Sequence, residues 1–486
     1  MNMQSRSLCA GLVLLAAGSA VRADSPTLAF SSYLGGADVD SAQAVTTDAA
    51  GFVYVAGVTL SDDFPDPHPL PAAGPRHDVF VVKLDPAGQL VWSARFGGSR
   101  NELPNGIAVT ENRVWVAGWT DSGDFPRIKP LDGQAPTVTG DHDVFATALD
   151  PADGSLLTST NLGGTDDDYG EGIAVDGRGN VYLTGGTSSQ DFPAGPKLRT
   201  AGTGYFKAFV TKLTADGSRL AYSILLNGSE TSNGLEIAVD AGGHAVIAGV
   251  TSSTDFPVVH AAQPAWGGGF SEGFVAKLAP SGNALLWSTF LGGRGEEQLQ
   301  GVALDRGGRA WVAGWTSSPD FPVRAAFQTR LRGESDAVVA GFGPSGKLTS
   351  STYLGGRKED SASSIAVDAA GALHVAGGTG SADFPVLHPV QAKCGLSEPF
   401  CSDAFVAKLQ PGAAGIAWAT YLGGKDTSYA FDVAVNPEGS TWPVGITEAA
   451  DFPQVRPLQP FAGGIADAWV AKLVSGGKAS GGKKSR

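Results

Sequence analysis

The stretch "SIAVDAAGALHVAGGTGSADFP", residues 364–385, contains the pattern from which the fold can be worked out. Two apolar runs, "IAV" and "LHVAG", flank a "DAAG" tetrapeptide of the kind that closes a hairpin with its glycine in the left-handed conformation. The stretch ends in Asp-Phe-Pro (DFP), and the chain contains this tripeptide seven times. The seven copies are Asp63-Phe64-Pro65, Asp124-Phe125-Pro126, Asp191-Phe192-Pro193, Asp255-Phe256-Pro257, Asp320-Phe321-Pro322, Asp383-Phe384-Pro385 and Asp451-Phe452-Pro453.

Two further sequences recur in step with DFP. "LGG" or a close variant precedes each apolar pair, and a sequence like "DAFVAKL" (403–409) follows each DFP. Each unit therefore predicts four short strands, of the types "IAVD", "LHVAG", "DAFVAKL" and "LLWSTFLGG" (285–293). A loop carrying DFP joins the second strand to the third.

The unit count and the chain ends predict the architecture. Four strands in each of seven units favour an all-β fold, a seven-bladed β-propeller of four-stranded antiparallel blades. The chain opens with an isolated fourth-type strand, "LAFSSYLGG" (28–36), and its last unit stops after the third-type strand "DAWVAKL" (467–473). Joining the N-terminal strand to the last blade would close the ring and remove two open sheet edges.

The whole pattern, "YLGG…D…IAVDAAG…VAG.T.S.DFP…Q…DAFVAKL", resembles the bacterial seven-bladed β-propeller repeat family, SBBP. The resemblance covers essentially all of residues 28–473. It implies an exported or cell-surface propeller, and it implies no shared catalytic activity.

The chain ends predict two segments outside the propeller, which we place at residues 24–474. Residues 1–23 have a basic start at Arg6, an apolar run at 8–21 and a small residue at Ala23, as in a signal peptide. A retained membrane anchor is the alternative. The basic, Gly/Ser-rich residues 475–486 predict a flexible tail. We expect an exported protein, periplasmic, extracellular or on the cell surface, with no transmembrane segment once the signal peptide is cleaved.

Cysteine usage and charge narrow the possible partners. After loss of Cys9 with the leader, Cys394 and Cys401 remain, and an oxidising compartment predicts a disulfide between them. The net charge of −14 argues against a nucleic-acid partner.

We interpret DFP as structural, because a catalytic group is needed once whereas a packing wedge is needed in every blade. The aspartate would accept backbone N–H groups, the phenylalanine would fill the gap between blades, and the proline would hold the preceding residue extended.

An acid stands four residues after the second glycine of LGG in five units, and serine replaces it in the other two. If these acids ringed the mouth of the central channel, they would attract Ca²⁺, the one cofactor that the sequence suggests. The alternative, which we favour, is that each acid caps its own turn. The candidate metal ligands are Asp40, Glu102, Asp168, Glu297 and Asp360.

Three tryptophans are candidate ligand-binding residues. Trp119 and Trp315 hold equivalent positions in "VAGWT", and Trp266 lies in a glycine-rich loop. Exposed indoles could stack on sugars or on aromatic partners. The alternative is that they plug gaps between blades, as large aromatics are usually mostly buried.

Catalytic motifs such as H-E-x-x-H and the phosphate-binding G-x-x-x-x-G-K-[ST] are absent from the sequence. We therefore expect a monomeric, non-catalytic binding or structural module whose DFP-loop face engages a glycan or a protein. The alternative is a polysaccharide lyase or hydrolase on a propeller scaffold, which rests on fold analogy alone.

Overall fold

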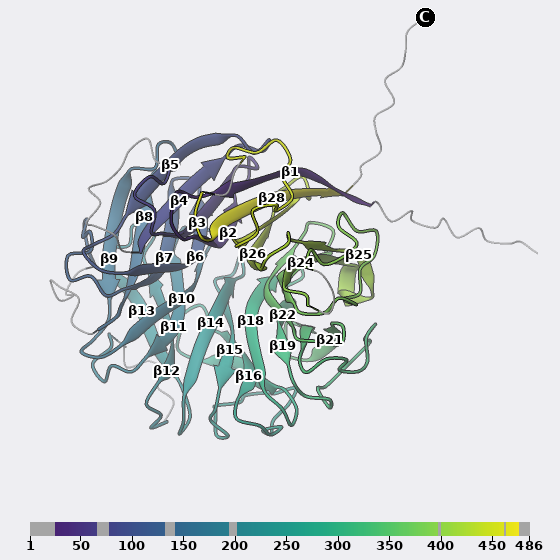
Figure 1. Cartoon of the computed structure of the whole chain (residues 1–486). Coiled ribbons are helices and arrows are strands. Elements are labelled where there is room, and N and C mark those ends of the chain that lie inside the picture. Colours follow the sequence, from purple (N-terminus) through teal and green to yellow (C-terminus); the bar gives the residue numbers. More distant parts are fainter. Residues whose placement is uncertain are drawn as a thin grey trace, which may run out of the picture.

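The computed structural model describes residues 25–65, 77–131, 141–193, 202–396, 400–460 and 463–475. The expected signal peptide at 1–23 lies outside these ranges, and so does the expected tail at 475–486 except for Ser475, which ends the last strand. Within them the chain forms seven four-stranded antiparallel sheets arranged around a central axis, the seven-bladed propeller that the sequence predicts (Figure 1).

Each blade is a meander whose first strand is the innermost. Blade 1 consists of β2 (Asp40–Thr47), β3 (Val53–Thr59), β4 (Asp78–Leu84) and β5 (Leu90–Phe96). Blade 2 consists of β6 (Glu102–Thr110), β7 (Arg113–Thr120), β8 (Asp143–Leu149) and β9 (Leu156–Leu162). Blade 3 consists of β10 (Asp168–Val175), β11 (Val181–Thr187), β12 (Lys207–Leu213) and β13 (Leu220–Leu226). Blades 4 and 5 are β14 (Ser232–Val239), β15 (Ala245–Thr251), β16 (Glu272–Leu278), β17 (Leu285–Leu291); and β18 (Glu297–Leu304), β19 (Ala310–Thr316), β20 (Asp336–Phe342), β21 (Leu348–Leu354). Blade 6 is β22 (Asp360–Val367), β23 (Leu373–Thr379), β24 (Asp403–Leu409) and β25 (Ile416–Leu422), with the 3₁₀ turn η1 (Pro411–Ala413) between its last two strands.

Blade 7 is built from both ends of the chain. Its strands are β26 (Ser428–Val435), β27 (Thr441–Thr447), β28 (Asp467–Ser475) and, outermost, the N-terminal β1 (Pro26–Leu34). β1 pairs antiparallel with β28 from Pro26 opposite Ser475 to Leu34 opposite Ala468, and Figure 1 shows the purple strand beside the yellow one. The ring is therefore closed as the sequence predicts, and the pairing satisfies the backbone groups of both terminal strands.

The propeller has two faces, which we name by the connections they carry. The turn face bears the tight hairpin turns within blades. At the first turn of blade 6, Asp368 accepts the N–H groups of Ala370 and Ala372, each at 2.9 Å, and Gly371 takes a φ of +82°. The loop face bears the DFP loops and the crossings from one blade to the next.

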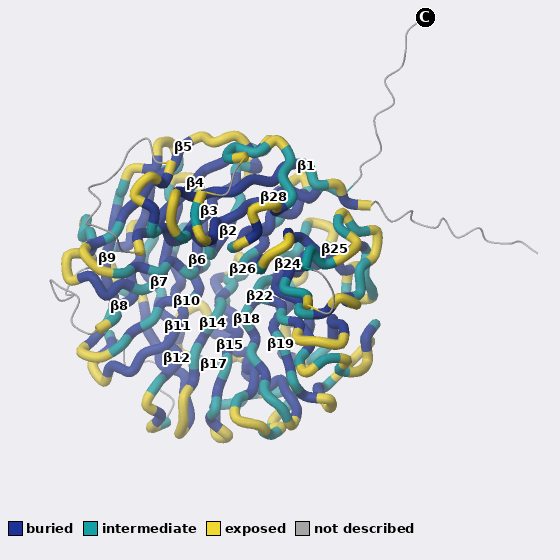
Figure 2. The backbone as a smooth tube through the Cα atoms, in the orientation of Figure 1, coloured by how far each residue is buried: buried dark blue, intermediate teal, exposed yellow. Residues whose placement is uncertain are grey.

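Apolar side chains gather in seven clusters, each drawn from two neighbouring blades. Figure 2 shows the buried strands in dark blue between exposed yellow turns and loops. Every cluster contains the phenylalanine of one DFP, with 2–6% of its surface exposed. Phe384, for example, lies between blades 5 and 6 with its ring 4.6 Å from that of Phe405. The DFP phenylalanine thus fills a seam between blades.

The DFP aspartate fixes the crossing loop. Asp63 accepts the N–H of Ala37 at 2.8 Å, and Asp383 accepts that of Arg357 at 2.9 Å, in both cases from the residue that follows LGG. These bonds tie the end of the second strand to the start of the same blade.

The innermost strands start earlier than the sequence predicts. The apolar run places the first strand of blade 6 at Ile365, but β22 begins at Asp360. Its pairing with β23 shifts by one residue between Ala362 and Ser364, so a β-bulge interrupts the alternation of buried and exposed positions. The bulge hides the first half of the strand from a pattern-based prediction.

Candidate functional site

The five acids proposed as calcium ligands do not meet at the channel mouth. Each is the first residue of an innermost strand, where the apolar pattern had not placed the strand, and each is at most 1% exposed. Asp40 accepts the N–H of Gly36 at 2.7 Å and the hydroxyl of Ser61 at 2.8 Å, and Asp360 does the same with Gly356 and Ser381. This is the alternative in which each acid caps its own turn.

A second buried acid faces each of these five across the first glycine of LGG. A Cβ atom added to Gly35 would lie 2.6 Å from carboxyl oxygens of both Asp40 and Asp467, the first residue of β28. The same arrangement surrounds Gly355, which lies between Asp336 and Asp360. The seams therefore hold five carboxyl pairs: Asp40 with Asp467, Glu102 with Asp78, Asp168 with Asp143, Glu297 with Glu272, and Asp360 with Asp336.

Burial makes these seam carboxyls weak acids. Desolvation raises the pKa of Asp40 to about 6 and that of Glu102 to about 7, against hydrogen bonds that favour the charged form. The second acid of a pair adds a smaller repulsion, as Asp78 does for Glu102. Within the described residues no three His, Cys, Asp or Glu side chains are grouped so that they could hold a metal ion.

The bulge of each innermost strand turns one side chain into the central channel, whose cavity measures about 800 Å³. This residue always stands three positions after the first residue of the strand. The seven residues, which we call the bulge ring, are Gln43, Asn105, Glu171, Leu235, Gln300, Ser363 and Phe431. Five of them are polar, and the seven side chains are of six different kinds, although the surrounding strands repeat.

Glu171 is the charged member of the bulge ring. The side-chain amides of Asn105 and Asn233 donate to its two carboxyl oxygens at 3.0 and 3.3 Å. Burial raises the pKa of Glu171 to about 7 despite the bond from Asn233. Because Asn105, Glu171 and Asn233 come from blades 2, 3 and 4, this network joins three blades across the channel wall.

A second carboxyl joins blades 6, 7 and 1. Asp432 accepts the N–H of Val45 at 2.7 Å and the hydroxyl of Ser364 at 2.5 Å. Burial raises its pKa. Asp432 follows Phe431 in β26 of blade 7, the blade that closes the propeller.

Trp119 belongs to an aromatic group on the loop face. It is half-buried, and its ring lies edge-on to His142 at 4.9 Å and to Tyr169 of the next blade at 5.9 Å. His142 Nδ1 is 2.9 Å from Asp167 and 3.1 Å from the hydroxyl of Tyr169. The indole is therefore part of a polar aromatic cluster between blades 2 and 3.

Trp315 borders a loop-face hollow of about 710 Å³ between blades 5, 6 and 7. Its Nε1–H donates to Gln298 at 3.2 Å, and Tyr429 lines both this hollow and the channel. The hollow also carries Glu334 and Glu359, both exposed. Trp315 thus stands at an acidic, aromatic-edged depression.

Trp266 is placed differently from the other two tryptophans. Its half-buried ring packs edge-on against Phe290 of β17, the outermost strand of blade 4, at 5.7 Å. This contact agrees with the plug alternative for Trp266.

Four large apolar side chains stand exposed on the loop face. Each comes two or three residues before the third strand of its blade, at the end of a DFP loop. They are Tyr205, Phe270, Phe400 and Ile465, which are 71%, 85%, 71% and 75% exposed. Exposed apolar groups on one face are typical of contact surfaces.

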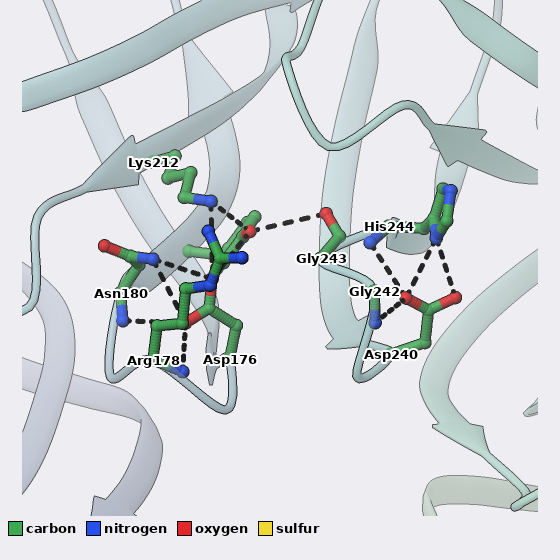
Figure 3. A network of polar contacts seen from close by, with 9 residues as sticks. Asp176, Arg178, Asn180, Lys212, Asp240, Gly242, Gly243 and His244 are labelled. Atoms are coloured by element: carbon green, nitrogen blue, oxygen red, sulfur yellow. Dashed lines mark hydrogen bonds and ion pairs between the residues drawn. The ribbon is translucent and has the colours of Figure 1, made fainter.

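On the turn face, polar side chains form hydrogen bonds with the backbone of their own turns (Figure 3). Asp176 accepts the N–H groups of Arg178 and Asn180, each at 2.9 Å, and pairs with Lys212 at 3.3 Å. In the neighbouring turn, Asp240 accepts the N–H of His244 at 2.9 Å. Groups bonded in this way hold the turns in shape.

Cys394 and Cys401 are joined by the disulfide that the sequence predicts. It closes the end of the blade 6 DFP loop, and both cysteines pack against the cluster between blades 5 and 6. Cys401 also lines the loop-face hollow beside Trp315. The bridge therefore fixes one edge of that hollow.

Sequence reasoning missed the bulge ring, although a signal for it exists. In the column three residues after the capping acid or serine, a buried strand should carry apolar residues, yet five of the seven are polar. Aligning the seven repeat units and looking for positions that vary, as well as for residues that recur, would have found the ring.

Two regions of the chain match the SBBP family model, which describes a beta-propeller repeat. The family model for this repeat matches residues 29–65 and 159–193. Each match runs from the outermost strand of one blade to the DFP of the next, the segment that carries LGG, the capping acid and the bulge. In the described residues, no helix is long and apolar enough to span a bilayer.

Relatives are distant. The regulatory protein FlaEY of Caulobacter vibrioides is 24% identical over 423 residues, which cover 83% of this chain and 42% of FlaEY. This chain thus spans less than half the length of that relative. Similar solved structures include the hydrazine synthase of Kuenenia stuttgartiensis (10% identity, TM-score 0.44, 84% of this chain and 92% of that one) and the Pan2 WD40 domain of Neurospora crassa (7% identity, TM-score 0.46, 94% and 97%).

Proposed function

We propose that this protein is a non-catalytic binding module that holds a glycan or protein partner at the loop face, over the mouth of the central channel. The observation that carries the proposal is the bulge ring. A scaffold position needs the same residue in every blade, whereas a position that recognises an asymmetric partner needs different residues in different blades.

The rest of the loop face supports the same role. Trp119, Tyr169 and Trp315 present aromatic edges there, and Tyr205 and Phe270 stand exposed on the DFP loops. Aromatic side chains combined with hydrogen-bonding groups are the usual composition of a contact surface. On the turn face, by contrast, Asp176 and Asp240 are bonded to the backbone of their own turns.

We further propose that the module acts after export, in the periplasm, at the cell surface or outside the cell. The support is the signal-like sequence of residues 1–23 together with the Cys394–Cys401 disulfide, a bond that persists in oxidising compartments.

The test is retention of the chain from residue 24 onward on an array of bacterial and plant polysaccharides and on surface proteins, with calcium and with a chelator. We expect one ligand class to retain the protein, and a Trp315→Ala variant to be retained less. A Trp266→Ala variant is the matched control, because its indole packs at the outer strand of blade 4.

Two results would contradict this function. Lack of retention in any condition would remove the binding role, and equal loss in both tryptophan variants would remove the loop face as its location. If a glycan is retained, a turnover assay on that glycan decides the enzyme alternative. If the chelator abolishes retention, the result would indicate that binding requires calcium.

A further inference from the structure

The channel lining contains three carboxyl groups and, among the described residues, no lysine, arginine or histidine. Glu171 and Glu236 come from blades 3 and 4, and Asp432 comes from blade 7, which lies across the ring from them. Burial raises the pKa of Glu236 well above its usual range, as it raises those of Glu171 and Asp432. The lining thus carries carboxyl groups on two sides of the channel, which ionise at higher pH than exposed acids do, and among the described residues it carries no side chain of opposite charge.

Three side-chain amides of the lining already donate hydrogen bonds. The amides of Asn105 and Asn233 donate to Glu171, and that of Gln43 donates to Ser41 at 2.8 Å. Asn233 Oδ1, in contrast, is buried and accepts no hydrogen bond. A ligand that supplies N–H or O–H donors would complement the carboxyl groups of this wall.

The blade 7 wall adds aromatic surface. The rings of Tyr429 and Phe431 lie 5.1 Å apart, next to Asp432. The faces of such rings attract cations, most strongly where water is excluded. Carboxyl groups and aromatic rings around one cavity are the complement of a positively charged organic group.

We propose that the central channel binds an organic cation that carries an ammonium or guanidinium group, supplied by a lysine or arginine side chain of a partner or by a free amine. This inference rests on the proposed binding function and specifies the chemical class of the ligand that the channel binds. A cavity of about 800 Å³ is of the size that holds small molecules or a single inserted side chain.

The test is isothermal titration calorimetry at pH 8.0 with the chain from residue 24 onward. The probes are spermidine, a short peptide with one lysine, the same peptide with that lysine acetylated, and glucose. We expect spermidine or the lysine peptide to bind, and we expect no binding of the acetylated peptide or of glucose. A tighter spermidine complex would indicate a free amine as ligand, and a tighter peptide complex would indicate a side chain of a partner.

A double variant locates the site. Glu171→Gln with Glu236→Gln replaces two carboxyl groups by amides of nearly the same shape and should weaken binding at least tenfold. Glu111→Gln removes an exposed acid of a turn-face hairpin and should leave binding unchanged. The melting temperature of each variant verifies folding, and if the double variant does not fold, the comparison of lysine with acetyl-lysine on the unsubstituted chain still decides.

The outcomes separate this inference from the proposed function. Retention on an uncharged glycan without binding of any amine would contradict the cation and leave the binding module intact. Equal affinity of the double variant would also contradict the channel as its site. A chain that binds neither an amine nor anything on the array would contradict both proposals.

Discussion

The glycines of LGG are required by their neighbours. The space that a Cβ atom would take at Gly355 is filled by carboxyl oxygens of Asp336 and Asp360, and at Gly356 by the DFP aspartate Asp383. LGG, the capping acid and DFP thus recur together because they form one contact set. The recurrence of each motif is visible in the sequence, but the contacts between these motifs, which lie many residues apart, are visible only in the structure.

Gly355→Ala should lower the free energy of unfolding by roughly 2–3 kcal/mol, because the added methyl would lie 2.7 Å from both acids in a buried seam. Gly123→Ala is the control, since nothing lies within 4 Å of its Cβ position. Denaturant titration of both variants measures the difference. Equal stability of the two would show that the seam has room to relax.

Ala325→Gly should instead stabilise the protein. Ala325 is exposed and takes a φ of +48°, in the left-handed region that costs L-residues roughly 1–2 kcal/mol. Glycine removes this strain but loses more entropy on folding, so we expect a net gain of roughly 0.5 kcal/mol. A lower unfolding midpoint in urea would contradict the assignment of strain to this position.

At the scale of the element, the blade was predictable and its first strand was not. Outer strands show uninterrupted apolar runs such as "DAFVAKL", whereas the bulge at Ser363 puts a polar side chain into the middle of β22. The same bulge makes the candidate site. The hairpins, the DFP seams and the disulfide could therefore be predicted from the sequence. The bulge ring could not, because the apolar pattern places the start of β22 after the bulge.

Phe384→Ala should destabilise the protein by roughly 3–5 kcal/mol, because it empties a seam between two blades. Phe270→Ala removes the same side chain where it is 85% exposed and should change stability by less than about 0.5 kcal/mol. Thermal or chemical unfolding of the pair gives the comparison. A small effect for Phe384 would mean that the DFP phenylalanine is not a wedge.

At the scale of the whole molecule, the carboxyl pairs couple the ring to pH. The pKa values of the seam acids are raised in the folded chain, to about 7 for Glu102, Asp168 and Glu272 and to about 6 for Asp40, Asp78 and Asp360, with burial as the main cause in each. Unfolded acids titrate near pH 4. Between pH 4 and 7 the folded chain therefore binds more protons than the unfolded chain, and stability falls as pH rises through that window.

The melting temperature should consequently be higher at pH 5.5 than at pH 8.0. His77 and His374 act in the opposite direction, since burial lowers their pKa values, but the acids with raised pKa values outnumber them. Glu102→Gln should reduce the pH dependence, whereas Glu111→Gln, at an exposed turn, should not. A melting temperature that rises from pH 5.5 to 8.0 would show that the pairs are not protonated as described.

The account as a whole rests on the claim that the loop face, with the channel beneath it, is where this propeller binds. The most direct measurement is the dissociation constant of whichever array ligand is retained, for the unsubstituted chain, for a Trp315→Ala and Asn105→Ala double variant, and for Glu111→Gln. The account predicts at least a tenfold weaker complex for the loop-face and channel variant and no change for the turn-face one. The reverse pattern, or equal affinity in all three, would contradict it.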